Sequence, residues 1–133
     1  LSIQPGDPST PGGVPSIESR VSLIFEGLVN RAAGDRTAAL RRWVDVCATT
    51  PARLLGFSHK GRLLPGYDAD IVIFDPEATS TITARSLHET AGWTPYEGTA
   101  LRGRPVITIS RGEIIADHGQ WLGHPGRGRF IER

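Results

Sequence analysis

The stretch GYDADIVIFDP, residues 66–76, is where the sequence changes from helical to strand-like patterns. Its apolar run is rich in β-branched residues and is typical of a buried strand. Asp68 and Asp70 stand two residues apart at its start, after a turn at Gly66 and Tyr67. Residues i and i+2 of a strand point to the same side, so the two carboxylates could converge. They could hold a metal or act as an acid–base pair, or they could be turn residues that begin the strand.

The turn interpretation is favoured, because a metal site needs more ligands and the stretch itself contains no histidine or cysteine. Aspartate side chains accept hydrogen bonds from free backbone N–H groups in Asx turns. We therefore predict structural roles for Gly66, Asp68 and Asp70, in forming the turn and starting the strand.

Upstream of this stretch the apolar residues follow helical spacing. Residues 1–15 are rich in proline and glycine and predict a loop. Ser16 stands at an N-cap position, and apolar residues then recur at intervals of three and four as far as Ala32. Two further helices are expected, one beginning at Asp35 or Thr37 and a short one running from a Thr50 cap to a stop at Gly56.

Downstream, the pattern is that of strands separated by turns. The expected strands are residues 69–75, 79–84 and 98–103, followed by a strand, a turn at Arg111 and Gly112, a strand, a turn at Asp117, His118 and Gly119, and a last strand within residues 104–123. Helices followed by strands indicate an α+β chain, or the ends of two different units.

Composition excludes several classes of protein. The 133 residues suffice for one domain with a modest core, and 15 Lys and Arg against 14 Asp and Glu give no electrostatic case for nucleic acid or an anionic membrane. No apolar stretch approaches the roughly 20 residues that span a bilayer. The one cysteine, Cys47, favours a reducing cytoplasm. Methionine is absent even at position 1, so we expect a trimmed product or a piece of a longer polypeptide.

No catalytic constellation is expected within the chain. Cys47 lies on an apolar helical stripe and should be an inert thiol. Neither a nucleophile elbow nor a phosphate-binding Walker pattern is present, and WTPYEG (93–98) is expected to be a turn. The four histidines lack metal-ligand spacing and are expected to be surface or structural residues: His59, His88, His118 and His124.

Four segments together resemble a known family. GGVPSIESRVSLIF, TTPARLLGF, KGRLLPGYDADIVIFDP and YEGTALRGRPVITISRGEIIADHGQWLGHPGRGRFIER are similar, in order, to the C-terminal part of cyclic amidohydrolases of the dihydropyrimidinase/hydantoinase type. Dihydroorotase, allantoinase and the dihydropyrimidinase-related proteins are relatives. The resemblance runs from about Pro11 to Arg133.

The resemblance implies a parent enzyme with a (β/α)8 barrel and a β-sandwich built from both ends of the chain. Two divalent metals, zinc being the expected ion, would be held by a His-x-His, a carboxylated lysine, two further histidines and an aspartate. A metal-bridging hydroxide would attack the cyclic amide, with the aspartate as proton shuttle. None of these positions has a match in this chain, so we expect it to contain no catalytic residue and no metal ligand, and to be inactive alone.

The same resemblance divides the chain. Residues 1–15 would follow the last barrel strand, 16–56 would be the terminal barrel helices, 57–122 sandwich strands, and 123–133 a tail that contacts neighbouring subunits. The loop PGGVP would touch the substrate through backbone groups of Gly12, Gly13 or Val14. Relatives have Asn-Gly-Gly where this chain has Pro11-Gly12-Gly13, so only backbone contacts are carried over.

Three functions remain open from the sequence. The first is the C-terminal part of a metal-dependent enzyme that opens a dihydropyrimidine, hydantoin, dihydroorotate or allantoin ring, with the missing N-terminal barrel portion and further copies as partners. The alternative is a non-catalytic assembly module that resembles dihydropyrimidinase-related proteins. The third is a small standalone binding protein. A fragment should expose apolar residues of its helices, Ile24 and Leu28 among them, and should self-associate.

Overall fold

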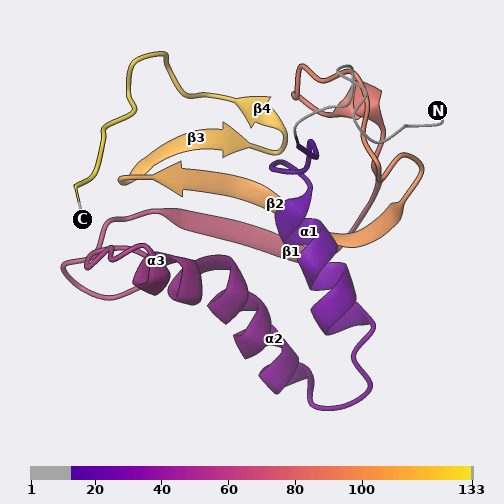
Figure 1. Cartoon of the computed structure of the whole chain (residues 1–133), viewed down its shortest axis with the longest axis horizontal. Coiled ribbons are helices and arrows are strands. Elements are labelled where there is room, and N and C mark those ends of the chain that lie inside the picture. The colour runs from indigo at the N-terminus through magenta and orange to yellow at the C-terminus, as the bar shows by residue number, and fades with distance from the viewer. Residues whose placement is uncertain (1–12, 133) are drawn as a thin grey trace.

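Helices pack against a four-stranded antiparallel sheet in the computed structural model, which describes residues 13–132 (Figure 1). The α+β class expected from the sequence is confirmed. The strands neighbour one another in chain order, β1-β2-β3-β4. The elements are α1 (Arg20–Phe25), α2 (Arg36–Val44), α3 (Thr50–Leu54), β1 (Ile71–Thr81), β2 (Ala100–Ser110), β3 (Glu113–Asp117) and β4 (Gln120–Trp121).

The first helix begins later than the sequence predicts. Its regular part starts at Arg20 rather than directly after Ser16, although the Arg20 N–H already donates to the Ser16 carbonyl at 2.8 Å. Glu18 does not face the helix end, because its carboxylate accepts hydrogen bonds from His88. Ile17, expected on the apolar face, is 86% exposed. After Phe25 the helix continues as a π-helical turn, Glu26–Asn30.

The second and third predicted helices form one continuous helical segment. Asp35 caps it as predicted, accepting the Thr37 N–H at 2.8 Å. The prediction of a separate cap at Thr50 is wrong, since Thr50 has helical dihedral angles and its hydroxyl donates to Asp45 instead. A π-helical turn, Asp45–Thr49, ends two residues before Pro51, which has no N–H to continue the regular ladder.

The helix stops at Gly56, as the sequence predicts. Gly56 has a positive φ of 77°. Its N–H donates to the Arg53 carbonyl, and the Phe57 N–H donates to the Ala52 carbonyl. This pair of bonds is the Schellman arrangement, in which a glycine turns the chain out of the helix.

The sheet merges strands that the sequence separates. Residues 69–75 and 79–84 were expected as two strands, but β1 continues from Ile71 to Thr81 through an irregularity between Asp75 and Thr79. The Asp75 carboxylate accepts the N–H groups of Glu77 and Ala78 and so forms a turn within the strand. β2 pairs along both parts of β1, which makes one ladder of them.

The two hairpin turns lie where the sequence predicts them. Arg111 and Gly112 have φ values of 50° and 81°, and His118 and Gly119 have 46° and 84°. Two consecutive positive φ angles are the signature of the type I′ turn that joins antiparallel strands. The last strand, β4, is short, with only Gln120 and Trp121.

Three aromatic rings hold the helices to the sheet. Phe25 of α1, Trp43 of α2 and Phe74 of β1 lie with ring centroids 4.7–5.0 Å apart, in edge-on and tilted geometries. Phe25 is fully buried, and the Trp43 indole N–H donates to the Val21 carbonyl at 3.1 Å. The three ring contacts therefore fix α1, α2 and β1 to one another.

The rest of the core is thin. Ile24 and Leu28, expected to be exposed, are half-buried. Large apolar side chains elsewhere are exposed, with Leu54 at 77%, Leu63 at 72% and Phe130 at 92%. The buried apolar residues among those described are Phe25, Val29, Ala52, Ile82 and Leu101. None of the described helices is both long and apolar enough to cross a membrane.

Replacing Gly103 by alanine should destabilise the fold. An added Cβ would lie 2.6 Å from Cδ1 of Phe25 and 2.8 Å from Cε1 of Phe74, at a φ of 106°. Overpacking and an unfavourable φ together should cost about 2–4 kcal/mol of unfolding free energy, measured by urea denaturation of the 133-residue chain. Gly92→Ala is the control, since Gly92 has a φ of 70° and open space around it. Equal losses for both variants would contradict this account.

Candidate functional site

The Asp68 and Asp70 carboxylates converge on a lysine. The Lys60 ammonium lies 2.8 Å from Oδ2 of Asp68 and also hydrogen-bonds Oδ2 of Asp70. The Asp68 N–H closes the loop by donating to the His59 carbonyl at 2.9 Å. Lys60 is the only lysine in the chain, and it stands eight and ten residues before the two aspartates. This spacing is the signal in the sequence from which the ion pairs could have been predicted.

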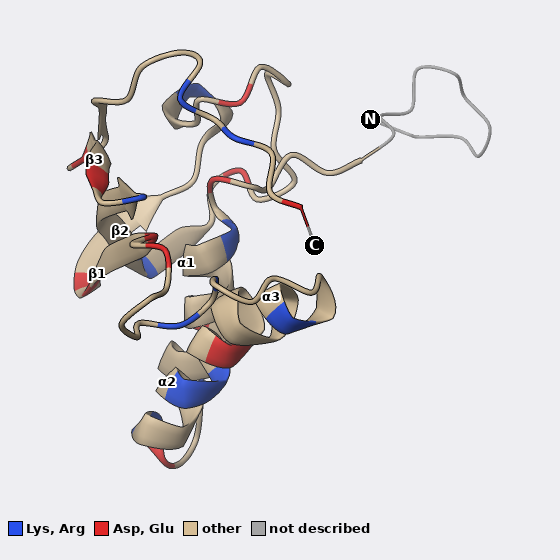
Figure 2. Cartoon of the chain, turned by 90° about the vertical axis from the view of Figure 1, so that its left-hand side faces the viewer, with Lys and Arg blue, Asp and Glu red and all other residues tan. Residues whose placement is uncertain are grey.

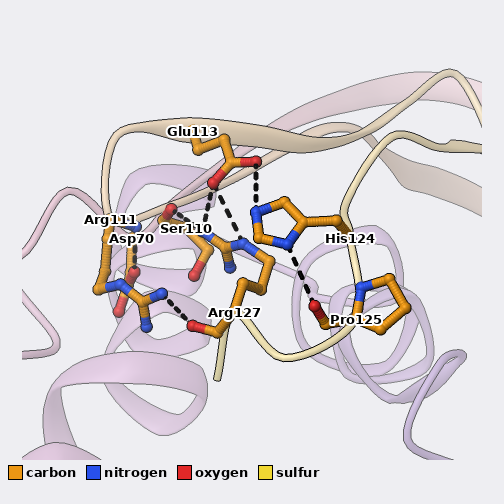
Figure 3. Close-up of polar contacts among 7 residues, drawn as sticks. All are labelled: Asp70, Ser110, Arg111, Glu113, His124, Pro125 and Arg127. Carbon is orange, nitrogen blue, oxygen red and sulfur yellow. Dashed lines mark hydrogen bonds and ion pairs between the residues drawn. The ribbon is translucent and has the colours of Figure 1, made fainter. Parts of the chain in front are cut away.

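Asp70 also joins the start of β1 to the β2–β3 turn. Its Oδ1 accepts the Arg111 N–H at 2.8 Å, as Figure 3 shows. Next to it, the Gly112 N–H donates to the Ala69 carbonyl at 3.0 Å. The carboxylate therefore connects the loop after α3 and the start of the first strand to the hairpin turn, which lies 41 residues further along the chain.

The pKa shifts of this cluster follow from these contacts. Burial alone would raise the pKa of Asp70, but hydrogen bonds from Lys60 and Arg111 and the lysine charge bring that pKa below its usual value. For Lys60, burial would lower the pKa, yet the bonds to Asp68 and Asp70 raise it overall. Both groups are therefore charged at neutral pH and bound to each other.

Gly66 lies in the turn that leads to this cluster. The Tyr67 N–H donates to the Leu64 carbonyl at 3.1 Å, and Gly66 has a φ of 87°. With Pro65 and Gly66 at its centre, this is the arrangement of a type II turn, whose third residue needs a positive φ. These contacts are compatible with structural roles for Gly66, Asp68 and Asp70, and those roles stay a prediction.

A second polar cluster fastens the C-terminal segment to the β2–β3 hairpin (Figure 3). The Arg127 side chain is only 12% exposed, and its guanidinium donates to the Ser110 carbonyl at 2.7 Å and to Oε2 of Glu113 at 3.1 and 3.2 Å. Arg111 donates to the carbonyl of Arg127, and His124 Nε2 lies 3.9 Å from Glu113. The end of the chain is therefore fixed in place up to Arg127.

The proposed substrate-contact loop is only partly described. Gly12 lies outside the described residues. Gly13 and Val14 are exposed, and an added Cβ on Gly13 would meet no atom within 4 Å. The backbone of these two residues is thus open to a molecule that approaches it. Their contact with a substrate stays a prediction.

A shallow hollow of about 470 Å³ lies between the π-helical turn that follows α1 and the paired ends of β1 and β2. Its two charged lining residues, Glu26 and Arg102, are each paired with a neighbouring residue. Hydrogen bonding from Asn30 holds the pKa of Glu26 below its usual value against the effect of burial, with a smaller contribution from Arg31. Arg102 pairs with Glu77. The lining residues are Glu26, Thr79, Ser80, Thr81, Ala100, Leu101 and Arg102.

Within residues 13–132, no three His, Cys, Asp or Glu side chains lie together as metal ligands would. Cys47 is half-buried, and burial raises the pKa of its thiol, against a weaker effect of the Arg20 charge. Figure 2 shows acidic and basic residues interspersed along helices and strands. The carboxylates of Asp68 and Asp70 hold segments of the chain together.

Replacing Asp70 by asparagine should weaken the fold most at neutral pH. The folded-state pKa of Asp70 is lowered, so its stabilisation is present above the ordinary value of 3.8 and is lost as the pH falls through the lowered pKa. The expected loss is about 1 kcal/mol at about pH 7, after allowance for solvent screening, and less at about pH 3. Urea denaturation of both proteins at the two pH values measures it.

The control for this prediction is a double-mutant cycle with Lys60→Met. If the ammonium and the carboxylate stabilise each other, the losses of the two single variants should add to more than the loss of the double variant. Additive losses, or a loss for Asp70→Asn that is the same at both pH values, would contradict the ion-pair account.

Sequence comparison relates the whole chain to curated enzymes. D-phenylhydantoinase from Escherichia coli O1:K1 / APEC is 42% identical over 135 residues, which is 100% of this chain and 28% of that protein. The D-phenylhydantoinase of Escherichia coli O127:H6 (strain E2348/69 / EPEC) is 41% identical over 137 residues, with the same coverage. The chain thus spans little more than a quarter of the length of these relatives.

Solved structures and a family match agree with this relation. D-hydantoinase from a Bacillus sp. AR9 superposes with a TM-score of 0.83 at 34% identity, over 92% of this chain and 26% of that one. L-hydantoinase (dihydropyrimidinase) from Arthrobacter aurescens gives 0.82 at 30% identity, over 91% and 26%. Residues 12–116 match the amidohydrolase family. That match covers most of the chain, and the chain therefore belongs to the amidohydrolase family.

Proposed function

We propose that this chain is the C-terminal part of a cyclic amidohydrolase that opens the ring of a cyclic amide or ureide. The observation that carries the proposal is identity along the whole chain to proteins named D-phenylhydantoinase. Hydantoin and dihydropyrimidine rings are the substrates that these names favour, and dihydroorotate and allantoin remain the other candidates. The complete protein would act in the cytoplasm, in keeping with its single cysteine.

The metal centre that the resemblance implies does not fit the described residues. Among residues 13–132 no group of three potential ligands is assembled, and the aspartates of the 57–70 loop are bound to Lys60. Two divalent metals, zinc in our proposal, would therefore be held by residues of the remaining part of the protein.

The contribution of this chain to the reaction is positional. Gly13 and Val14 would present backbone groups to the substrate from an exposed loop. The aromatic cluster of Phe25, Trp43 and Phe74 fixes the helix after that loop to the sheet. In the proposed layout residues 1–15 follow the last barrel strand, 16–56 are barrel helices, 57–122 are sandwich strands and 123–133 form the tail.

A ring-opening assay tests the proposal directly. The purified 133-residue chain, incubated with zinc or manganese and with dihydrouracil, hydantoin, dihydroorotate or allantoin, should show no turnover and no stoichiometric metal. The complete protein that carries this segment should open at least one of these rings and should hold metal. The measurement is product formation, with metal content determined on the same samples.

Either of two results would contradict the proposal. Turnover by the isolated chain with bound metal would mean that Asp68, Asp70 and the histidines form a site. A complete protein that folds and assembles but opens none of the rings would favour the non-catalytic assembly module instead. The presence of a His-x-His and a barrel lysine upstream distinguishes the two in advance.

The proposed partners are the remaining part of the protein and further copies of it. Exposed apolar side chains such as Leu63, Trp121 and Phe130 form surface that a lone domain of this size would bury. We expect the isolated chain to self-associate as its concentration rises, by sedimentation velocity, and to do so less when the upstream portion is co-expressed. A chain that stays monomeric at all concentrations would contradict this expectation.

A further inference from the structure

The loop between β1 and β2 reaches back to the start of α1. The His88 N–H donates to Oε2 of Glu18 at 2.7 Å, and His88 Nδ1 lies 2.9 Å from Oε1 of the same carboxylate. In return, the Glu18 N–H donates to Oε1 of Glu89 at 3.3 Å. The segment before α1 and the β1–β2 loop, some 70 residues apart, thus each supply a carboxylate that accepts a backbone N–H of the other.

The loop that supplies His88 and Glu89 is itself held firmly. At its base the Gly98 N–H donates to the carbonyl of Ile82, which is 5% exposed. In the first turn of the loop the Thr83 hydroxyl accepts the Ser86 N–H and the Ser86 hydroxyl accepts the Thr83 N–H, both at 3.2 Å. Thr94 is buried within the loop. A loop ordered in this way can act as a fixed support for the segment that it touches.

The segment that it touches lies directly after the proposed substrate-contact loop. Gly13 and Val14 precede Glu18 by five and four residues. Among the described contacts, the backbone bond from Arg20 to Ser16 is the other one that anchors residues 13–18 to the fold. The reciprocal bonds of Glu18 therefore set where the exposed backbone of Gly13 and Val14 lies.

Two atoms at this junction are buried without hydrogen-bond partners. They are the Ser19 hydroxyl oxygen and Oε2 of Glu89. Leaving buried polar atoms unpaired lowers stability. Both atoms belong to residues that adjoin or form the bonds between Glu18 and the loop.

We propose that Glu18, His88 and Glu89 are positioning residues that hold the Gly13–Val14 loop at the substrate. This inference rests on the proposed function, because it takes the loop to contact the ring. The three residues do not touch the substrate. They act through the backbone that does, by fixing the turn between that loop and α1.

Steady-state kinetics of the complete protein that carries this segment tests the proposal. Glu18→Ala and Glu89→Ala should each raise KM roughly tenfold while kcat stays within about twofold. The reason is that a displaced loop binds the substrate and the transition state more weakly by the same amount. General destabilisation would instead lower the active fraction, and with it the apparent kcat, at unchanged KM. Glu18→Gln should restore KM to within about threefold, since its amide can accept from the His88 N–H and donate to Nδ1.

Glu97→Ala is the matched control. It removes a carboxylate from the same loop, where Oε2 holds the Ala84 N–H, without touching α1. It should leave KM within about twofold of the wild-type value. A rise in KM for Glu97→Ala equal to that for Glu89→Ala would overturn the proposal, as would unchanged KM in both alanine variants of the junction.

Amide hydrogen exchange of the 133-residue chain separates this proposal from the proposed function. The amides of Glu18 and Arg20, which donate hydrogen bonds, should exchange about tenfold faster in Glu18→Ala and Glu89→Ala than in the wild type and in Glu97→Ala. Unchanged exchange would overturn the positioning role whether or not the complete protein is an enzyme. If exchange is faster in the variants but the complete protein opens none of the rings, the proposed function is contradicted. The substrate role of the loop is then contradicted too, and Glu18, His88 and Glu89 form only a structural junction.

Discussion

The contact between Phe25, Trp43 and Phe74 is the interaction on which the rest of the structure depends. It joins both helices to the first strand, and Gly103 of the second strand lies against two of the three rings. The rings can approach the backbone so closely only because position 103 has no Cβ, and the φ of 106° there is one that glycine tolerates. A single glycine thus permits the helices to pack on the sheet.

Charged residues then fix the segments that the aromatic cluster does not reach. Asp70 connects Lys60 to the Arg111 turn, and Arg127 connects the tail to the same hairpin (Figure 3). Each of these pairs is partly exposed, so each adds little stability by itself. These bonds determine the position of the turns, because a carboxylate that accepts a hydrogen bond from a particular backbone N–H fixes where that turn lies.

Local signals in the sequence predicted the features that depend on neighbouring residues. The Asp35 cap, the Gly56 stop and the two type I′ turns follow from residues within four positions of one another. The errors have long-range causes. The sequence divides β1 at Pro76, but pairing with β2 joins its halves, and Glu18, just before α1, binds His88, 70 residues away.

The same distinction applies to the candidate site. A search for catalytic patterns in the sequence treats each carboxylate as available, yet Asp68, Asp70 and Glu18 are all engaged in hydrogen bonds or ion pairs. Against the effect of burial, hydrogen bonds from Lys60 and Arg111 bring the pKa of Asp70 below its usual value, so this carboxylate is a poor proton carrier near neutral pH. In the function that we propose, proton transfer would depend on groups elsewhere in the protein. Selection on such a segment would act on geometry, through glycines and paired carboxylates, rather than on reactive side chains.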